Sequence, residues 1–402
     1  MSRGFVCLGL MSGTSMDGID AVLAKITPAG DTTLAHVSFP YSKSLRDELF
    51  RAVAKPLLSL ENFGALDARI GGAFAAAAVK CIRTARAKKI RADVDVIGSH
   101  GQTVFHNPQR LVSLQLGSPQ VIANATGVTT VSNFRMADIV AGGEGAPFLP
   151  FYHRRIVGAR AGVAVHNLGG ISNFTYFGTN GKLVALDTGP ASCLMDAAIS
   201  ALSHGRQTFD RGGAWASAGR VSEKLLNFLK RERAVAAYIA RPAPKSTGRE
   251  LFTFELAERV LREAKQLRLA REDVLATLGQ FSVDLMVVAY ERFVLRRGLP
   301  LKEVVFCGGG ARNPFLLGRF QDSMPTVKVR VLEDYGVASQ AIEAQAFGCY
   351  GIMAIAGQAQ NVPAATGARA EVVCGEITPG RNWSRLYQKV HSASHKNVSI
   401  LL

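Results

Sequence analysis

Two segments of this 402-residue chain share an arrangement that restricts the folds open to it. The first, CLGLMSGTSMDGIDAVLAKI at residues 7–26, places a turn rich in Gly, Ser and Thr between two apolar runs of strand character. The second, GVAVHNLGGISNFTYFGTNGKLVALDTGP at residues 162–190, predicts strand, glycine turn, strand, an Asn180-Gly181 hairpin and a third strand. Because helical segments follow each unit, the chain is predicted to be an α/β protein with two similar halves.

The segments between these units alternate between helix and strand signals. Hydrophobic periodicity predicts helices at about residues 45–54, 60–89, 217–231 and 338–356. Strands are expected around residues 98–108, 111–119 and 127–135, and EVVFCGGG at 303–310 ends a further strand in glycines. A chain of this length is expected to form two domains rather than one.

Composition excludes several classes of protein. The chain is 48% hydrophobic and 19% charged, which is typical of a globular protein without disordered tails. Six cysteines form no C-x-x-C pair and most lie in apolar segments, which predicts reduced, buried thiols and a cytoplasmic protein. No signal peptide or membrane span is expected, since no segment reaches about 18 uninterrupted apolar residues.

The net charge of +16 raises the question of an anionic partner. The basic residues are spread along the chain, and the densest cluster, RTARAKKIRAD at residues 83–93, ends a predicted helix where cations complement the helix dipole. A solvated basic surface is therefore expected, and no nucleic-acid partner.

The three glycine turns have the composition of phosphate-binding loops. A turn of Gly, Ser and Thr between buried strands presents several backbone N–H groups together, although the same residues also suit a plain hairpin. Asp17 and Asp20 beside the first turn favour a phosphate site, because carboxylates there hold hydrated Mg²⁺. NLGGISN at 167–173 and FCGGGARNP at 306–314 are further turns of this kind.

Common nucleotide and hydrolase motifs are missing from the sequence. Lys245-Ser246-Thr247 follows Pro244 rather than Gly, so the Walker A pattern is absent. There is no G-x-G-x-x-G, H-E-x-x-H or G-x-S-x-G motif. His100 and His106 lie six residues apart around an expected turn, which favours loop hydrogen bonding over a metal site.

Asp187 in VALDTGPASCLMDA is the carboxylate that the pattern singles out. It is expected to end a strand just before a helix that has Pro190 at its first position and Gly189 as cap. Strand ends in open α/β sheets face the ligand, and Asp187 lies too early to cap the helix. A chemical role is therefore favoured over local capping.

Seven motifs in order resemble those of the anhydro-N-acetylmuramic acid kinase family. They are GLMSGTSMDGID, GSHGQTVFHNP, FRMADIVAGGEGAP, NLGGISNFTY, LDTGP, PAPKSTGRELF and CGGGARNP, and the resemblance runs from about Phe5 to Gly380. The resemblance implies the two-lobed sugar kinase/Hsp70/actin-like α/β fold, with ATP bound in the interdomain cleft. It implies an N-terminal lobe of residues 1–130 plus about 362–402 and a C-terminal lobe of residues 131–361.

The resemblance also implies a chemistry, cofactors and partners. An enzyme of this family uses ATP and Mg²⁺ to open 1,6-anhydro-N-acetylmuramic acid with water and phosphorylate O6, giving N-acetylmuramic acid 6-phosphate for cell-wall sugar recycling. One ionised carboxylate serves the attacking water and the charge developing at C1, and Asp187 matches that base. The small anhydrosugar is the expected partner, and a homodimer is implied.

The residues implied for the site fall into three groups, with the metal ligands left unknown. The base is Asp187. The residues implied for ATP are Gly13, Thr14, Ser15, Met16, Asp17, Gly18, Ile19, Asp20, Gly169, Gly170, Gly308, Gly309, Gly310 and Asn313. The residues implied for the sugar are Arg135, Glu343, His100 and Gly101, and Lys245 and Arg249 are expected at the rim.

Several positions depart from the family pattern and leave alternatives open. They are Ser118 and Asn133 where Asp is expected, Glu144 for Gln, and Ser192 for Asn. Because these positions belong to the sugar side, a kinase of another 1,6-anhydrosugar such as levoglucosan is an alternative. A catalytically silent ATP-binding regulator is a second alternative, against which the retention of Asp187 argues.

Overall fold

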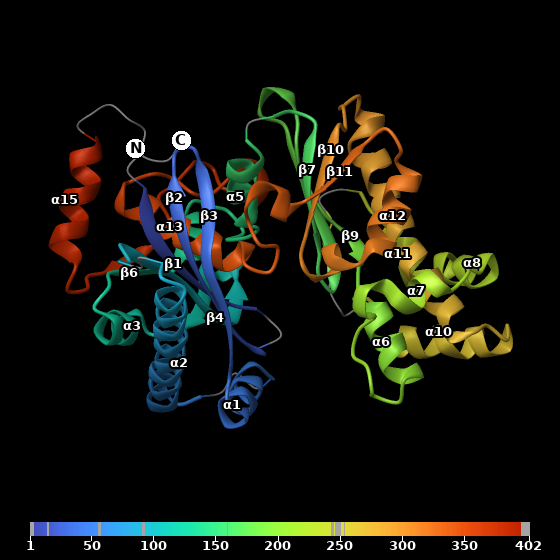
Figure 1. Cartoon of the computed structure of the whole chain (residues 1–402), viewed down its shortest axis with the longest axis horizontal. Helices are drawn as coiled ribbons and strands as arrows, with labels where there is room; N and C mark the ends of the chain where they lie inside the picture. The colour runs from blue at the N-terminus through green and yellow to red at the C-terminus, as the bar shows by residue number, and fades with distance from the viewer. Residues whose placement is uncertain are drawn as a thin grey trace. The chain divides into compact units, whose positions relative to one another are not determined.

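A computed structural model of the chain describes residues 4–13, 16–54, 58–90, 93–158, 160–242, 245, 251–252 and 254–394. The chain divides into two compact units (Figure 1). Unit 1 comprises Met1–Ile156 and Gly336–Leu402, and unit 2 comprises Val157–Tyr335. The α/β fold in two parts that the sequence predicts is confirmed.

The unit boundaries differ from those expected for the two lobes. Residues 131–156 and 336–361 belong to unit 1, although the expected division placed them in the C-terminal lobe. The reason is packing: helices α5 (Leu149–Val157) and α13 (Ile342–Ile355) meet each other, and Tyr350 donates a hydrogen bond to the Phe148 carbonyl at 2.6 Å. These segments bury their apolar side chains in unit 1, which sequence patterns could not assign.

Unit 1 is built on a mixed sheet. Its strands are β1 (Phe5–Ser12), β2 (Gly18–Thr27), β3 (Gly30–Pro40), β4 (Val96–Asn107), β5 (Val112–Leu116), β6 (Thr130–Ser132) and β12 (Glu376–Thr378). The sheet order is β12-β6-β4-β1-β2-β3, with β5 paired to β4. β1 and β4 are parallel, as are β4 and β6, and the other pairs are antiparallel.

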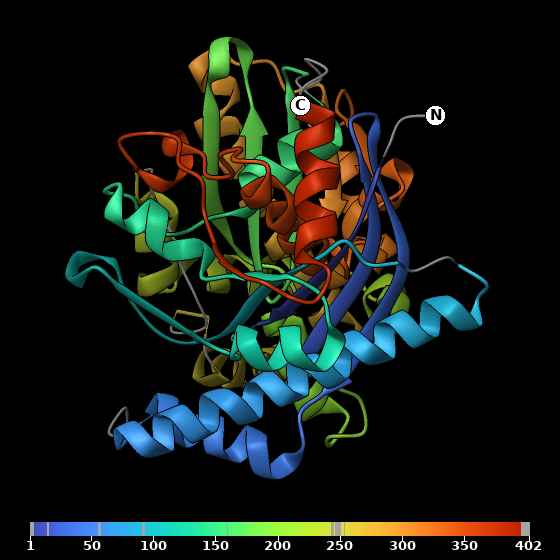
Figure 2. The same ribbon diagram turned by 90° about the vertical axis from the view of Figure 1, so that its left-hand side faces the viewer.

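Helices cover both faces of this sheet. They are α1 (Lys43–Ala54), α2 (Leu60–Ala87), α3 (Pro119–Thr126), α4 (Phe134–Val140), α5, α13, α14 (Pro363–Thr366) and α15 (Trp383–Ser394), with the 3₁₀ turn η1 (Pro108–Arg110). Figure 2 shows α2 as one long continuous helix. Alternate residues of β1 face opposite sides: Leu8 and Leu10 join the core under α2, whereas Gly9 lies against α13.

Glycine in β1 and β4 permits the close approach of α13. A Cβ atom on Gly9 would lie 1.6 Å from the Ala344 carbonyl oxygen, and one on Gly98 would lie 1.8 Å from that of Phe347. No other residue fits at such separations. The contact fixes α13, and with it the side chains at the start of that helix.

Unit 2 repeats the same plan. Its strands are β7 (Val163–Leu168), β8 (Ile171–Phe177), β9 (Leu183–Pro190), β10 (Glu303–Cys307) and β11 (Lys328–Val331), in the order β11-β10-β7-β8-β9. Its helices are α6 (Cys193–Leu202), α7 (Ala214–Ala218), α8 (Glu223–Arg231), α9 (Arg233–Ala240), α10 (Phe254–Gln266), α11 (Arg271–Phe293) and α12 (Pro314–Ser323). Its 3₁₀ turns are η2 (Thr179–Gly181), η3 (Arg211–Gly213), η4 (Leu295–Arg297), η5 (Gly309–Arg312) and η6 (Leu332–Tyr335).

The two sheets have equivalent topologies. In unit 2, β7 pairs antiparallel with β8 and β8 with β9, whereas β7, β10 and β11 run parallel. The strands β3-β2-β1-β4-β6 of unit 1 have the same order and directions. The architectural similarity of the two halves, predicted from their opening hairpins, therefore extends to the whole central sheet.

Two predicted helices begin or end elsewhere. The single helix expected at 217–231 is two helices, α7 and α8, because a Cβ on the intervening Gly219 would lie 2.1 Å from the Glu272 carbonyl oxygen. Pro190 does not begin a helix. It pairs with Ile171 as the last residue of β9, and α6 begins at Cys193 with Ser192 as its N-cap.

The cysteines and the most apolar helix agree with a packed interior. All six cysteines lie in the described part of the chain as thiols, and all but Cys193 are buried. One described helical stretch, Arg271–Arg297, is long and apolar enough to span a membrane, but 72% of its most apolar window is buried inside the protein. A core helix has the same properties.

Candidate active site

The first glycine turn joins β1 to β2 in unit 1. Gly13, Met16, Asp17, Gly18, Ile19 and Asp20 are described, whereas Thr14 and Ser15 lie outside the described residues. The side chains of Met16 and Ile19 are buried in the core, so they anchor the turn. Asp17 points to solvent and accepts a hydrogen bond from Arg46 Nη2 at 2.5 Å.

Gln102 supports this turn through hydrogen bonds to Ser12 and Gly13, although the sequence did not indicate a role for it. Its side chain is fully buried; Oε1 accepts a hydrogen bond from Ser12 Oγ at 2.7 Å, and Nε2 donates to the Gly13 carbonyl at 3.2 Å. Its place between Gly101 and Thr103 in the predicted strand gave little signal, although a buried amide requires nearby partners. Gln102 therefore links strand β4 to the candidate phosphate turn.

His100, Gly101 and Arg135 meet in unit 1. Arg135 Nε donates to His100 Nε2 at 3.0 Å, so the ring proton lies on Nδ1, which donates to the Gly101 carbonyl at 2.9 Å. Burial lowers the pKa of His100 to about 3, helped by the charge of Arg135. His100 is therefore neutral at physiological pH, and its ring packs on Phe347 of α13 with centroids 4.6 Å apart.

Glu343 lies beside this group rather than in the middle of a helix. It is the second residue of α13, because that helix begins at Ile342 and not near 338. Burial raises the pKa of Glu343, the charge of Arg135 lowers it, and Asp20 raises it again. Asp20 accepts hydrogen bonds from His36 Nε2 at 3.0 Å and Ser38 Oγ at 2.6 Å, both on Oδ1. Unit 1 thus gathers Arg135, His100, Glu343 and Asp20.

The departures from the family pattern have local explanations in part. Asn133 Nδ2 donates to Glu376 Oε1 at 2.6 Å, so an Asp here would place two carboxylates in contact. Asn133 also has a positive φ of 53°, a conformation that Asn tolerates well. Glu144 is exposed and accepts from Gln109 Nε2 at 3.4 Å. Ser118 and Ser192 are N-cap residues without side-chain capping bonds, and nothing in the structure explains these two changes.

The second glycine turn joins β7 to β8 in unit 2 and is tied to the start of α6. The Gly169 carbonyl accepts from Ser192 N at 3.1 Å, and the Gly170 carbonyl accepts from Ala191 N at 3.0 Å. A Cβ on Gly169 would meet no atom closer than 3.5 Å, so one face of the turn is open. The turn therefore presents its backbone beside a helix N-terminus, as anion sites do.

The third glycine turn, at the end of β10, packs against the second. A Cβ on Gly308 would lie 2.4 Å from Asn167 Oδ1, and one on Gly310 would lie 2.8 Å from Leu168 Cβ. Gly309 has nothing within 4 Å of its Cβ position. Asn313 caps α12 by accepting from Phe315 N at 3.1 Å, so its side chain has a structural task.

Asp187 lies within β9 opposite Asn173, and its side chain is half-buried. Its backbone is held at both ends: Tyr238 Oη donates to the Asp187 carbonyl at 2.7 Å, and Asp187 N donates to the Lys245 carbonyl at 3.2 Å. The next residue, Thr188, donates to Ser172 Oγ at 2.7 Å. Asp187 thus lies within a firmly bonded strand that continues to Pro190, and not at the end of the strand as expected.

Lys245 was expected at the rim of the site. Its side chain is instead buried, and its backbone carbonyl is bonded to Asp187. The side chain is 8% exposed, and Nζ lies 4.0 Å from the centroid of the Tyr238 ring. Burial and the charges of Arg292 and Arg241 together lower the pKa of Lys245 to about 8, although the charge of Asp187 opposes this shift. Arg249 lies outside the described residues.

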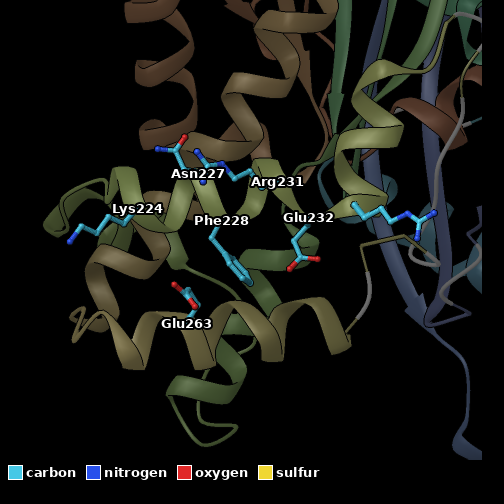
Figure 3. Close-up of a pocket in the computed structure, with 7 residues that line it drawn as sticks. Lys224, Asn227, Phe228, Arg231, Glu232 and Glu263 are labelled. Carbon is cyan, nitrogen blue, oxygen red and sulfur yellow. The ribbon is translucent and has the colours of Figure 1, made fainter.

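A separate hollow on unit 2 contains none of these residues. It has a volume of about 540 Å³ and lies between α8 and α10 (Figure 3). It is lined by Lys224, Asn227, Phe228, Arg231, Glu232, Arg233 and Glu263. Glu232 there forms an ion pair with Arg259, which accounts for part of the charge on these helices. The groups of the candidate site lie instead at the turns and strands described above.

Comparisons with known proteins identify the family. The family described as anhydro-N-acetylmuramic acid kinase matches residues 5–380. The chain is 37% identical over 376 residues to the protein of that name from Aliivibrio fischeri, covering 92% of this chain and 98% of that one. It is 41% identical over 387 residues to the one from Streptomyces avermitilis, covering 94% and 96%. The chain therefore belongs to the anhydro-N-acetylmuramic acid kinase family and is an enzyme of that kind.

The family predicted from the seven motifs is thus confirmed, and these relatives do not favour the two alternatives. Among solved structures, component A of (R)-2-hydroxyglutaryl-CoA dehydratase from Acidaminococcus fermentans is 12% identical, with a TM-score of 0.47. That match covers 86% of this chain and 97% of the other.

Proposed function

We propose that this protein uses ATP to phosphorylate O6 of 1,6-anhydro-N-acetylmuramic acid while water opens the anhydro bridge. The products are N-acetylmuramic acid 6-phosphate and ADP. The observation that carries the proposal is the family match across residues 5–380. The backbone bond that holds Asp187, the bonds that hold Arg135, and the charge interaction between Arg135 and Glu343 support it.

In this proposal Asp187 is the general base. Its carboxylate takes a proton from water as the water oxygen bonds to C1, and the bond between C1 and the bridging oxygen breaks. That oxygen, now O6, attacks the γ-phosphorus, and ADP leaves. A carboxylate also stabilises the positive charge that develops at C1. The bonds from Tyr238 and to Lys245 hold the Asp187 backbone, so the base does not need to be positioned during turnover.

Arg135 is proposed to bind the carboxylate of the lactyl group that distinguishes this sugar. The guanidinium has a fork of donors, of which Nε is used by His100 and Nη1 by the Gly145 carbonyl at 2.7 Å. Glu343 is proposed to accept a hydrogen bond from a sugar hydroxyl. His100 holds Arg135 in place, and the Gly101 carbonyl orients the His100 ring. Both residues are proposed to lie beside the bound sugar.

The three glycine turns are proposed to bind ATP. Backbone N–H groups at Gly13–Asp20 and at Gly169-Gly170 suit phosphate oxygens, and Gly308–Gly310 with Asn313 suit the adenosine. Gly169 and Gly309 fit this role because the Cβ position of Gly309 has nothing within 4 Å and that of Gly169 has no atom closer than 3.5 Å.

Mg²⁺ is proposed as the cation of the ATP complex, where it would neutralise charge on the transferred phosphoryl group. No group of three acidic, His or Cys side chains in the described residues forms a ready-made cage. This fits Mg²⁺, which commonly binds through one or two carboxylates, waters and substrate phosphates. Burial raises the pKa of Glu343, and the negative charge of Asp20 raises it further. A cation near Asp20 and Glu343 would relieve the repulsion between these two carboxylates.

A cytoplasmic homodimer is also proposed, from the family resemblance. Light scattering on the purified protein measures the mass directly against 43.0 kDa per chain. A single-chain mass would contradict the dimer.

The test of the function is a coupled assay for ADP release with Mg²⁺-ATP. Parallel reactions contain 1,6-anhydro-N-acetylmuramic acid, levoglucosan or no sugar. The proposal predicts turnover with the first sugar well above the other two, and mass spectrometry should find one phosphate and one water added. Turnover with levoglucosan alone would contradict the proposed substrate, and absence of turnover by ATP-binding protein would contradict the function.

A further inference from the structure

Asp138 is a fully buried carboxylate that is not among the groups proposed to bind ATP or to act as the base. Its Oδ1 accepts from Asn361 Nδ2 and from Thr366 Oγ1, both at 2.7 Å, and its Oδ2 accepts from the backbone N of Gly145 at 2.8 Å. A buried charge is expensive unless donors of this kind surround it. The residue therefore organises the loop that follows α4 and ties it to the segment around residues 361–366.

Asp138 does not pair with the arginine nearest to it on the helix. Arg135 precedes it by three residues on α4, a spacing at which opposite charges commonly meet. The described residues contain no ion pair between them. Instead the two are joined through Gly145: its N–H donates to Asp138, and its carbonyl accepts from Arg135 Nη1 at 2.7 Å.

The geometry of the loop makes the link from Asp138 through Gly145 to Arg135 specific. Gly145 has a φ of +64°, and a Cβ there would lie 2.7 Å from Ile139 Cγ1. A Cβ on Gly143 would lie 2.2 Å from Asp138 Oδ2. The backbone therefore wraps the carboxylate closely, and Gly145, whose N–H donates to Asp138 and whose carbonyl accepts from Arg135, has little room to move.

Arg135 keeps its charge unneutralised by any carboxylate at ion-pair distance within the described residues. Burial lowers the pKa of Arg135, and the more distant Glu343 raises it. Its Nε and Nη1 bonds go to neutral acceptors, His100 and the Gly145 carbonyl. A buried guanidinium held in this way is suited to an anionic ligand.

We propose that Asp138 is a positioning residue for substrate selection: by holding the backbone of Gly145, it aims the Arg135 guanidinium at the carboxylate of the sugar's lactyl group. This inference rests on the proposed function, because it assumes that the substrate carries that carboxylate. It predicts that the role of Asp138 is in choosing between sugars rather than in the chemistry of phosphoryl transfer.

The test compares two sugars that differ only in the lactyl ether, 1,6-anhydro-N-acetylmuramic acid and 1,6-anhydro-N-acetylglucosamine. Calorimetry gives the Kd of each for the wild type and for D138N, and the Kd of ATP serves as a check on the fold. The amide must turn a donor toward either Gly145 N–H or the Asn361 and Thr366 donors, so the network cannot form as before. D138N is expected to lower the preference for the lactyl sugar roughly tenfold or more, with the other two Kd values nearly unchanged.

T366V is the matched control. It removes one buried bond to Asp138 Oδ1 but leaves the bond between Oδ2 and Gly145. It should lower stability without changing the preference between the sugars. If D138N does not fold, D138E keeps the charge but displaces the carboxylate by one methylene, and the same loss of preference is expected.

The outcomes separate the inference from the function on which it rests. Equal weakening of both sugars in a folded Asp138 variant, or an unchanged preference, would overturn the positioning role while leaving the kinase intact. A wild type that phosphorylates the lactyl sugar but binds both sugars equally would overturn it too. A wild type that neither binds nor phosphorylates the lactyl sugar would refute the proposed function and the inference together.

Discussion

His166, a histidine buried on β7, makes the stability of unit 2 sensitive to acid. His166 is fully buried; its Nδ1 lies 2.8 Å from Tyr290 Oη and its Nε2 lies 2.6 Å from Ser172 Oγ. Burial lowers the pKa of His166 from 6.5 to about 3. The native state therefore holds this imidazole neutral, whereas the unfolded chain protonates it below about pH 6.5.

The direction and the size of this change in stability with pH follow from proton linkage. Between about pH 3 and 6.5 the unfolded state binds the extra proton, so stability is full above 6.5 and falls as the pH drops. A pH of 5 is about 1.5 units below the pKa of His166 in the unfolded chain, so protonation of the unfolded state lowers the stability by about 2 kcal/mol. That is a large fraction of the stability of an ordinary domain.

Urea unfolding at pH 5, 6, 7 and 8 measures this effect. The chain has two tryptophans, Trp215 in unit 2 and Trp383 in unit 1, so W383F leaves fluorescence from Trp215 as a reporter of unit 2. H166Q in this background should reduce the loss of stability between pH 7 and 5 by about 2 kcal/mol. H204Q removes an exposed histidine of the same unit and serves as control. An equal pH dependence with and without His166 would refute the reasoning.

Three further changes test the site and the packing. Asp187→Asn should abolish turnover while leaving the Kd of ATP nearly unchanged; calorimetry that finds both lost equally would remove Asp187 as the base. Asn133→Asp should destabilise unit 1 by up to about 1 kcal/mol through repulsion with Glu376, and E376Q should restore the melting temperature; no recovery in the double variant would contradict that account. Gly9→Ala should prevent unit 1 from folding, since its Cβ would lie 1.6 Å from a carbonyl oxygen of α13, whereas Gly64→Ala on α2 meets nothing within 4 Å. Similar circular dichroism melting curves for these two variants would show that α13 packs differently.

Local sequence patterns correctly predicted much of the fold. Each opening hairpin combines alternating apolar residues with a glycine turn, and β1, β2, β7 and β8 form where those patterns predict. Helix α2 was predicted at 60–89 and spans Leu60–Ala87, because Ser59 caps it and its apolar face is continuous. The α/β class followed from these elements alone.

Long-range packing decided what those patterns could not. The position of Pro190 was predicted from its preference for helix starts, yet pairing of β9 with β8 holds it in the strand. Gly219 interrupts the helix expected at 217–231 because the backbone of Glu272 occupies the space that a Cβ would need. Ile171, which pairs with Pro190, and Glu272, which lies against Gly219, are both distant from these residues in the sequence.

The candidate site shows the same division. The residue pattern singled out Asp187, and the resemblance to the family implied Arg135 and Glu343. Gln102 and Asp138 were not selected, since the identity of a polar residue does not reveal which backbone groups it will meet. Their partners are set by strand pairing and loop closure.

The family, the strand–turn–strand units and the residue types available for chemistry could be inferred from the sequence, because local conformational preference and side-chain identity belong to each residue. Tertiary packing was needed to show that Arg135 is held between His100 and the Gly145 carbonyl, and that Asp138 binds the N–H of the same glycine. Those contacts join β4, α4 and a distant C-terminal segment, and hydrogen bonds between such segments depend on positions that no local pattern encodes.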